Sequence, residues 1–84
     1  MKVGSRVVAI ENMDGRNIKG LTGTIVANYP TTNYDREDPK YLWGVFFDKE
    51  FDFGHDLIGH CKQGYGLWVN QNKLKTEYND EDWL

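Results

Sequence analysis

The chain places both of its histidines, its only cysteine and four of its nine glycines in one segment, residues 53–69. Imidazole and thiol groups are the common metal ligands, nucleophiles and general bases of proteins. Glycine lets the backbone approach a ligand or another strand closely. We therefore expect any specific chemistry of this protein to lie in or beside this segment.

Zinc binding is the first chemistry these residue types indicate. His55, His60 and Cys61 are zinc ligands by type, and Asp52 or Asp56 would complete a tetrahedral set. The spacing is unfavourable, because two adjacent residues of an extended chain point to opposite sides of the backbone. The alternative is structural: the imidazoles hydrogen-bond the loop backbone and the thiol packs as a small apolar group. We predict no resident metal or cofactor and keep zinc as a minor alternative.

Nucleophilic catalysis is the second chemistry, since Cys61, His60 and Asp56 are a thiol, a base and an acid in one stretch. A triad needs the base within hydrogen-bond reach of sulfur and a cleft that excludes water. A chain of 84 residues offers little concavity for such a cleft. No phosphate-binding loop that ends in Lys-Ser or Lys-Thr is present. We therefore predict a protein that is not an enzyme.

Binding is the class that best fits the aromatic residues in and before this segment. Phe51 and Phe53 stand among acidic residues and are predicted to be exposed anchors, with the alternative that both attach the loop to the fold. Trp43 and Trp68 are predicted to be structural, because a small core needs large rings. The predicted contact residues are Phe51, Phe53, His55, Asp56, His60 and Tyr65.

The charge of the chain favours a protein partner. The net charge is -3, and residues 30–60 carry seven acidic and three basic side chains. An acidic rim with aromatic rings suits a basic protein partner, although acidity also serves solubility. Nucleic-acid binding is disfavoured, because nucleic-acid modules present a basic face to phosphate. A further alternative is a small polar metabolite held by backbone N–H groups of Gly54, Gly59, Gly64 or Gly66.

Length and composition predict one small domain in the cytoplasm. Eighty-four residues leave no room for a second domain, and 14% aromatic content supplies a compact core. One cysteine cannot form an internal disulfide, which favours a cytosolic location. No apolar run reaches the length of a membrane span or a signal peptide.

The pattern of apolar residues predicts an all-β fold, because no segment shows helical periodicity. Short β-branched and aromatic runs separated by turn residues suit a small antiparallel five-stranded barrel over residues 3–78, followed by an acidic tail at 79–84. Residues 70–72 are expected to form a one-turn link. The predicted strands are 6–10, 22–27, 41–47, 66–69 and 73–78.

Alternation along the strands predicts which residues fill the core. Trp43, Val45 and Phe47 are assigned to the inner face of their strand, with Leu42, Gly44 and Phe46 on the other face. Gly20 and Gly23 are expected to mark a turn and a bulge or close strand crossing. The other predicted core residues are Val7, Ala9, Leu21, Ile25, Trp68, Val69 and Leu74.

Three stretches of the sequence resemble known small barrels. They are V-G-S-R-V-V at residues 3–8, G-L-T-G-T-I-V at 20–26 and W-G-V-F-F-D at 43–48. Together they resemble the opening of SH3-like barrels of the KOW, Tudor and Mind-bomb types. The later G-H-x-x-x-G loop and G-x-G-x-W-V strand are similar to those of short uncharacterised proteins of bacteriophages and prophages. The resemblance implies an SH3-like barrel and a phage or prophage setting, and no functional residues.

Overall fold

The computed structural model describes residues 1–13, 15–28 and 38–77, which form five strands and one 3-10 helix. The predicted one-turn link is the 3-10 helix, and every strand start lies within one residue of its prediction. The predicted tail at 79–84 and the predicted end of the last strand lie outside the described residues. In chain order the elements are β1 (Arg6–Ala9), β2 (Thr22–Asn28), β3 (Leu42–Phe47), β4 (Gly66–Asn70), η1 (Gln71–Lys73) and β5 (Leu74–Thr76).

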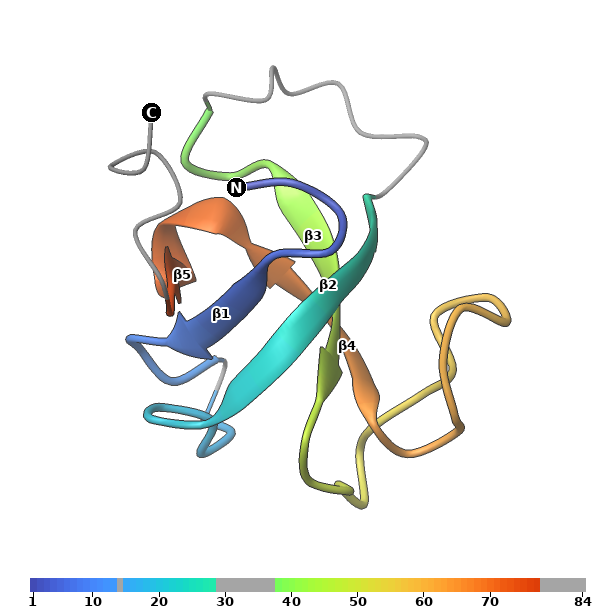
Figure 1. The fold of residues 1–84 in the computed structure, drawn as a ribbon. Coiled ribbons are helices and arrows are strands. Elements are labelled where there is room, and N and C mark those ends of the chain that lie inside the picture. Colours follow the sequence, from blue (N-terminus) through green and yellow to red (C-terminus); the bar gives the residue numbers. More distant parts are fainter. Residues whose placement is uncertain (14, 29–37, 78–84) are drawn as a thin grey trace.

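The strands form one antiparallel sheet in the order β4-β3-β2-β1-β5 (Figure 1). β1 pairs with β2 on one side and with β5 on the other, so the last strand of the chain returns to the first. The sheet bends around the main core, which makes the fold a small five-stranded barrel. The predicted all-β class and five-stranded barrel are thus confirmed. In the described part of the chain, no helix is long and apolar enough to span a membrane.

The inner face of the sheet carries the main core. Trp43, Val45 and Phe47 face inward as predicted, each at most 2% exposed. The polar edges of two buried rings are satisfied, because the Trp43 indole N–H donates to Gln71 and the Tyr41 hydroxyl accepts from Asn28. The predicted Leu21 is half-buried against this core. The buried members are Val7, Ala9, Ile18, Ile25, Tyr41, Trp43, Val45, Phe47, Leu67, Val69 and Leu74.

The prediction that Trp68 faces the main core is wrong. Trp68 and Val69 are neighbours on β4, and side chains of adjacent strand residues point to opposite faces. Val69 is fully buried in the core together with Leu67, so Trp68 lies half-buried on the outer face. There it is the cross-strand partner of Gly44 on β3.

A second, smaller apolar cluster covers the outer face beside Trp68. The register between β2 and β3 shifts after Ile25, which pairs with Val45, so that Ala27 pairs with Gly44. This irregularity turns Ala27 toward the outer face. A side chain at Gly44 would lie 3.3 Å from Ala27 Cβ and from Leu57 Cδ1, and 3.0 Å from Trp68 Cζ3. The outer cluster is therefore Ala27, Leu57 and Trp68, gathered over a glycine.

Gly66, like Gly44, leaves room for the Leu57 side chain because it has no side chain of its own. A Cβ at Gly66 would lie 2.5 Å from Leu57 Cγ, 2.7 Å from Cys61 Sγ and 2.7 Å from the His55 carbonyl oxygen. Contacts below 3.0 Å force neighbouring atoms to move. Leu57 is fully buried, although it belongs to the connection between β3 and β4 and to neither strand. Gly44 and Gly66 thus leave a space on the outer face of the sheet, and the Leu57 side chain fills it.

Two earlier glycines behave as the sequence predicts. Gly20 has a φ of 88° and forms the turn before β2. A Cβ at Gly23 would lie 2.6 Å from the Phe46 carbonyl oxygen, which is the predicted close crossing of strands. The bulge itself falls later in β2, between Ile25 and Ala27.

We expect Gly66→Ala to lower the free energy of unfolding by about 3 kcal/mol, at the upper end of overpacking costs. The added methyl group would meet a backbone carbonyl as well as Leu57, and the backbone is held by strand pairing. Gly44→Ala is the matched control, because its contacts are side-chain atoms at 3.0–3.3 Å. Urea denaturation should show the smaller loss for Gly44→Ala; equal losses would contradict the role given to Gly66.

Candidate functional site

The connection between β3 and β4 contains the predicted site, and we call residues 51–65 the rim loop. Its base is closed by backbone hydrogen bonds: the Phe51 N–H donates to Gly64 O at 2.7 Å, and His55 and Gly66 exchange N–H···O bonds of 2.9 and 2.8 Å. The loop extends away from the strands beside β4 (Figure 1). It is therefore an ordered projection attached to the end of the sheet.

The tip of the rim loop, residues 57–59, has an unusual backbone. Leu57, Ile58 and Gly59 have φ values of 53°, 59° and 87°, in the left-handed region. Side chains hold this turn from within: the Leu57 N–H donates to His55 Nδ1 and the Ile58 N–H donates to Asp56 Oδ1, both at 3.1 Å. Because a β-branched residue rarely adopts positive φ, Ile58 is strained.

Ile58 is also the most exposed large apolar residue of the described chain, at 74% exposure. Its neighbour Leu57 is fully buried in the outer cluster, so the two side chains leave the turn in opposite senses. Burial of the Leu57 side chain offsets the strain of its positive φ, whereas Ile58 gains little burial from the described part of the chain. Ile58 was not among the residues predicted from the sequence, because no local pattern marks a residue for positive φ.

The prediction that Phe51 and Phe53 are exposed is wrong, and the alternative, that both rings attach the loop to the fold, agrees with the structure. Both rings are half-buried and pack against the main core. They stack with centroids 5.0 Å apart, and Phe51 meets the Phe47 ring edge-on at 5.4 Å. The Arg16 guanidinium lies 4.8 Å over the Phe53 ring. These two residues hold the base of the rim loop.

The other predicted contact residues divide into supporting and exposed ones. His55 and Asp56 are half-buried and support the tip, while His60 is exposed on the same loop. Tyr65 is half-buried and meets the Phe46 ring edge-on at 5.7 Å. The Lys62 ammonium lies 5.5 Å over the Tyr65 ring. The rim loop therefore brings these residues onto one projection, but not into one cluster.

The arrangement of the rim loop does not favour zinc binding or thiol catalysis. Among residues 1–13, 15–28 and 38–77, no three His, Cys, Asp or Glu side chains lie close enough to hold a metal ion. Cys61 Sγ is directed at the carbonyl oxygens of His55 and Lys62, at 3.8 and 3.6 Å. Burial, with a smaller contribution from Asp56, raises the pKa of this thiol. A protonated thiol is a poor metal ligand and a poor nucleophile.

The hypothesis that the loop holds a small metabolite through glycine N–H groups is weakened by the structure. It requires free backbone N–H groups among the glycines of the loop. The Gly54 N–H donates to the Phe51 carbonyl, and the Gly66 N–H donates to the His55 carbonyl. Two of the four predicted donors are thus already used within the fold.

A shallow pocket of about 280 Å³ adjoins the rim loop on the outer face of the sheet. Its apolar side is formed by Phe46, Phe47 and Tyr65, and its polar side by Thr24 and Asp48. Phe46 is 36% exposed there. The pocket is open to solvent, so it offers a surface for a side chain more than an enclosure for a small molecule.

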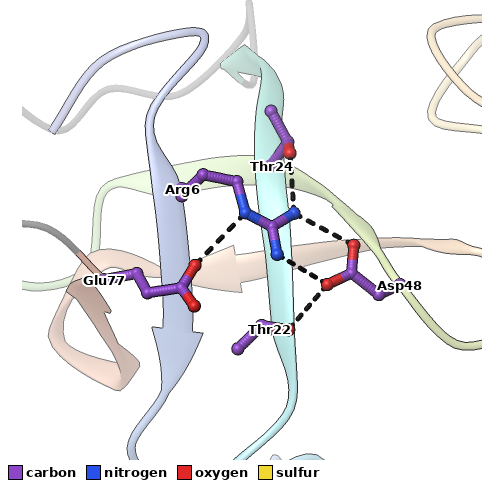
Figure 2. A network of polar contacts seen from close by, with 5 residues as sticks. All are labelled: Arg6, Thr22, Thr24, Asp48 and Glu77. Carbon is purple, nitrogen blue, oxygen red and sulfur yellow. Dashed lines mark hydrogen bonds and ion pairs between the residues drawn. The ribbon is translucent and has the colours of Figure 1, made fainter.

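Thr24 and Asp48, the polar residues of this pocket, belong to a network of polar contacts around Arg6 (Figure 2). Its guanidinium donates to both carboxylate oxygens of Asp48, at 3.0 and 2.6 Å, and to Glu77 at 3.2 Å. It also donates to Thr24, while Thr22 donates to Asp48 at 2.6 Å. The network connects β1, β2, the end of β3 and the residue after β5. The hydrogen bonds from Arg6 and Thr22 lower the pKa of Asp48 to about 2.

This bent five-stranded sheet and its long connection between β3 and β4 define the class of SH3-like barrels, as the resemblance predicted. A family model identifies the chain more closely: residues 1–75 match the Xrn1 SH3-like domain, and the protein belongs to that family. SH3-like domains are in general non-catalytic binding modules. Searches of the curated proteins and of the solved structures find no significant match.

We expect Ile58→Asn to raise the free energy of unfolding by about 1 kcal/mol, because asparagine tolerates the left-handed region better than isoleucine. Val3→Asn is the control, since Val3 is 55% exposed and has no positive φ. Urea denaturation of both variants measures the difference. Equal changes in the two variants would show that Ile58 is not strained.

We expect the Arg6–Asp48 pair to stabilise the fold at neutral pH and to lose this effect in acid. Because the folded pKa of Asp48 is depressed from 3.8 to about 2, its contribution is present above about pH 4 and disappears as pH falls through 2. Asp48 is 52% exposed, so solvent screening limits the contribution to about 1 kcal/mol. Unfolding of the wild type and Asp48→Asn at pH 7 to pH 2 should show a stability difference that closes toward pH 2. A constant difference would refute the assignment.

Proposed function

We propose that this protein is a binding module that recognises a protein partner through the rim loop, with Ile58 as the central contact. The observation that carries the proposal is the combination of strain and exposure at this one residue. An exposed isoleucine in the left-handed region lowers stability, and at 74% exposure Ile58 buries little of its apolar surface within the described chain. Burial against a partner would give this residue the favourable free energy that it lacks in the isolated chain.

The attachment of the loop supports this function. Binding a flexible loop costs conformational entropy, whereas a loop already held in one shape binds with a smaller cost. Leu57, the stacked Phe51 and Phe53 rings and the His55–Gly66 backbone pair hold the rim loop before any partner arrives. His60, two residues after Ile58, is also exposed and is proposed to add a polar contact to the interface.

The charge near the loop favours a basic surface around the partner's binding pocket. Residues 48–62 contain four acidic and two basic side chains. Charge complementarity of this kind accelerates association and selects among partners more than it adds affinity. A phage-encoded protein that binds a host factor in the bacterial cytoplasm would use such a surface, and this setting is proposed from the sequence resemblance alone.

We expect Ile58→Asn to reduce capture of the partner from a bacterial lysate at least about tenfold, the loss typical of a central contact. Val3→Asn, an equally polar change at another exposed apolar residue, should capture the partner as the wild type does. Quantitative mass spectrometry of the captured proteins provides the measurement. Because Ile58→Asn is expected to be no less stable than the wild type, a loss cannot come from unfolding. Identical partner lists for the wild type and Ile58→Asn would refute the proposal.

A further inference from the structure

One nitrogen atom of His55 takes part in holding the tip. Its Nδ1 accepts the hydrogen bond from the Leu57 N–H, at 3.1 Å. A neutral imidazole has one donor nitrogen and one acceptor nitrogen, whereas a protonated imidazole has two donors. The observed bond therefore requires the neutral ring with its proton on Nε2. Protonation would put a hydrogen on Nδ1, so the Leu57 N–H would face another donor in place of an acceptor.

The surroundings of His55 prevent a simple adjustment to this change. The backbone of His55 is paired with Gly66 through two hydrogen bonds, and its ring lies against Trp68 with centroids 6.3 Å apart. Leu57 is fully buried, so water cannot readily take the place of Nδ1 as the acceptor for its N–H. Loss of the bond would therefore leave a buried N–H without its acceptor, which is unfavourable.

The groups packed around His55 carry little charge that would counter this effect. From β4, Gly66 and the Trp68 ring face it, and both are uncharged. Within the rim loop, the Cys61 thiol lies against the His55 carbonyl. The carboxylate of Asp56 is directed at the Ile58 N–H. The only anionic neighbour among these groups is thus already engaged at the tip.

We propose that His55 is the positioning residue of the rim loop, and that its protonation releases the left-handed tip and weakens recognition through Ile58. Histidine is the side chain whose charge ordinarily changes between pH 5 and 8. The proposal deepens the proposed function and rests on it for its consequence in binding. The structural change itself is independent of any partner.

The test measures amide hydrogen exchange of Leu57 and Ile58 by ¹⁵N NMR at pH 7.5 and 5.5, after correction for the intrinsic pH dependence of exchange. In the wild type, protection of the Leu57 amide should be lower at pH 5.5 than at pH 7.5, because only the neutral ring can accept this hydrogen bond. A protection factor that is equal at both pH values would overturn the proposal.

Three variants separate positioning from a general structural role. His55→Asn offers a side-chain oxygen to the N–H two residues later, as in an Asx turn, and does not titrate. It should keep protection at both pH values, while His55→Phe should lose it at both. His60→Asn, on the same loop, should behave as the wild type. A pH-dependent loss in His55→Asn would overturn the proposal.

A second measurement holds even if no variant keeps the loop shape. The ¹⁵N chemical shifts of the His55 ring in the wild type report which nitrogen carries the proton. We expect Nδ1 to be unprotonated at pH 7.5, and a proton on Nδ1 would overturn the proposal. Neither measurement involves a partner, so failure of the capture experiment and failure of this inference are distinguishable.

Discussion

The space above Gly44 and Gly66 is the constraint on which the candidate site depends. Neither residue has a side chain, and Leu57 occupies the volume that two side chains would fill. Burying a leucine side chain contributes about 2 kcal/mol, enough to fix a loop that would otherwise be expected to move. Because Leu57 lies in the middle of the rim loop, its insertion fixes the residues on both sides of it. The shape of the loop is therefore a property of the sheet.

The same insertion explains the two-sided burial of the sheet. Its inner face packs the main core, and its outer face is covered beside β3 and β4 by Leu57 and Trp68. The bulge after Ile25 brings Ala27 to this outer cluster instead of the core. Small residues at Ala27 and Gly44 leave room for the larger ones. A chain of 84 residues thereby gains a second apolar cluster from a segment that looks, by composition, like a solvent-exposed connection.

Much of the fold could be predicted from the sequence, because strand periodicity is local. β-Branched and aromatic runs placed all five strands, and alternation placed Trp43, Val45 and Phe47 in the core. The prediction that Trp68 and Val69 both face inward ignored this alternation, whereas in the structure only Val69 faces the core. Ile18 and Leu57 were missed as buried residues since each lies in a connection, where burial depends on how the chain returns to the sheet.

The candidate site was less predictable, because it depends on backbone geometry more than on residue type. Composition indicated the segment around the histidines, and it favoured Phe51 and Phe53 as exposed contacts by the size of their rings. Those rings have a large apolar surface, and in the structure they bury part of it against the nearby main core. No residue pattern distinguishes an isoleucine with positive φ from one in a strand. That distinction arises only when His55, Asp56 and the buried Leu57 together impose the turn.

The two roles of His55 connect the sheet to the recognition surface. Its backbone continues the pairing of β4 through Gly66, while its ring holds the backbone of the tip. Local opening of this edge of the sheet would therefore also release the tip, and a partner that holds Ile58 would in turn stabilise the edge. Such coupling needs no transmission over a distance, since one residue takes part in both interactions. In this small barrel, the pairing of the sheet edge and the position of the binding surface are thus expected to change together.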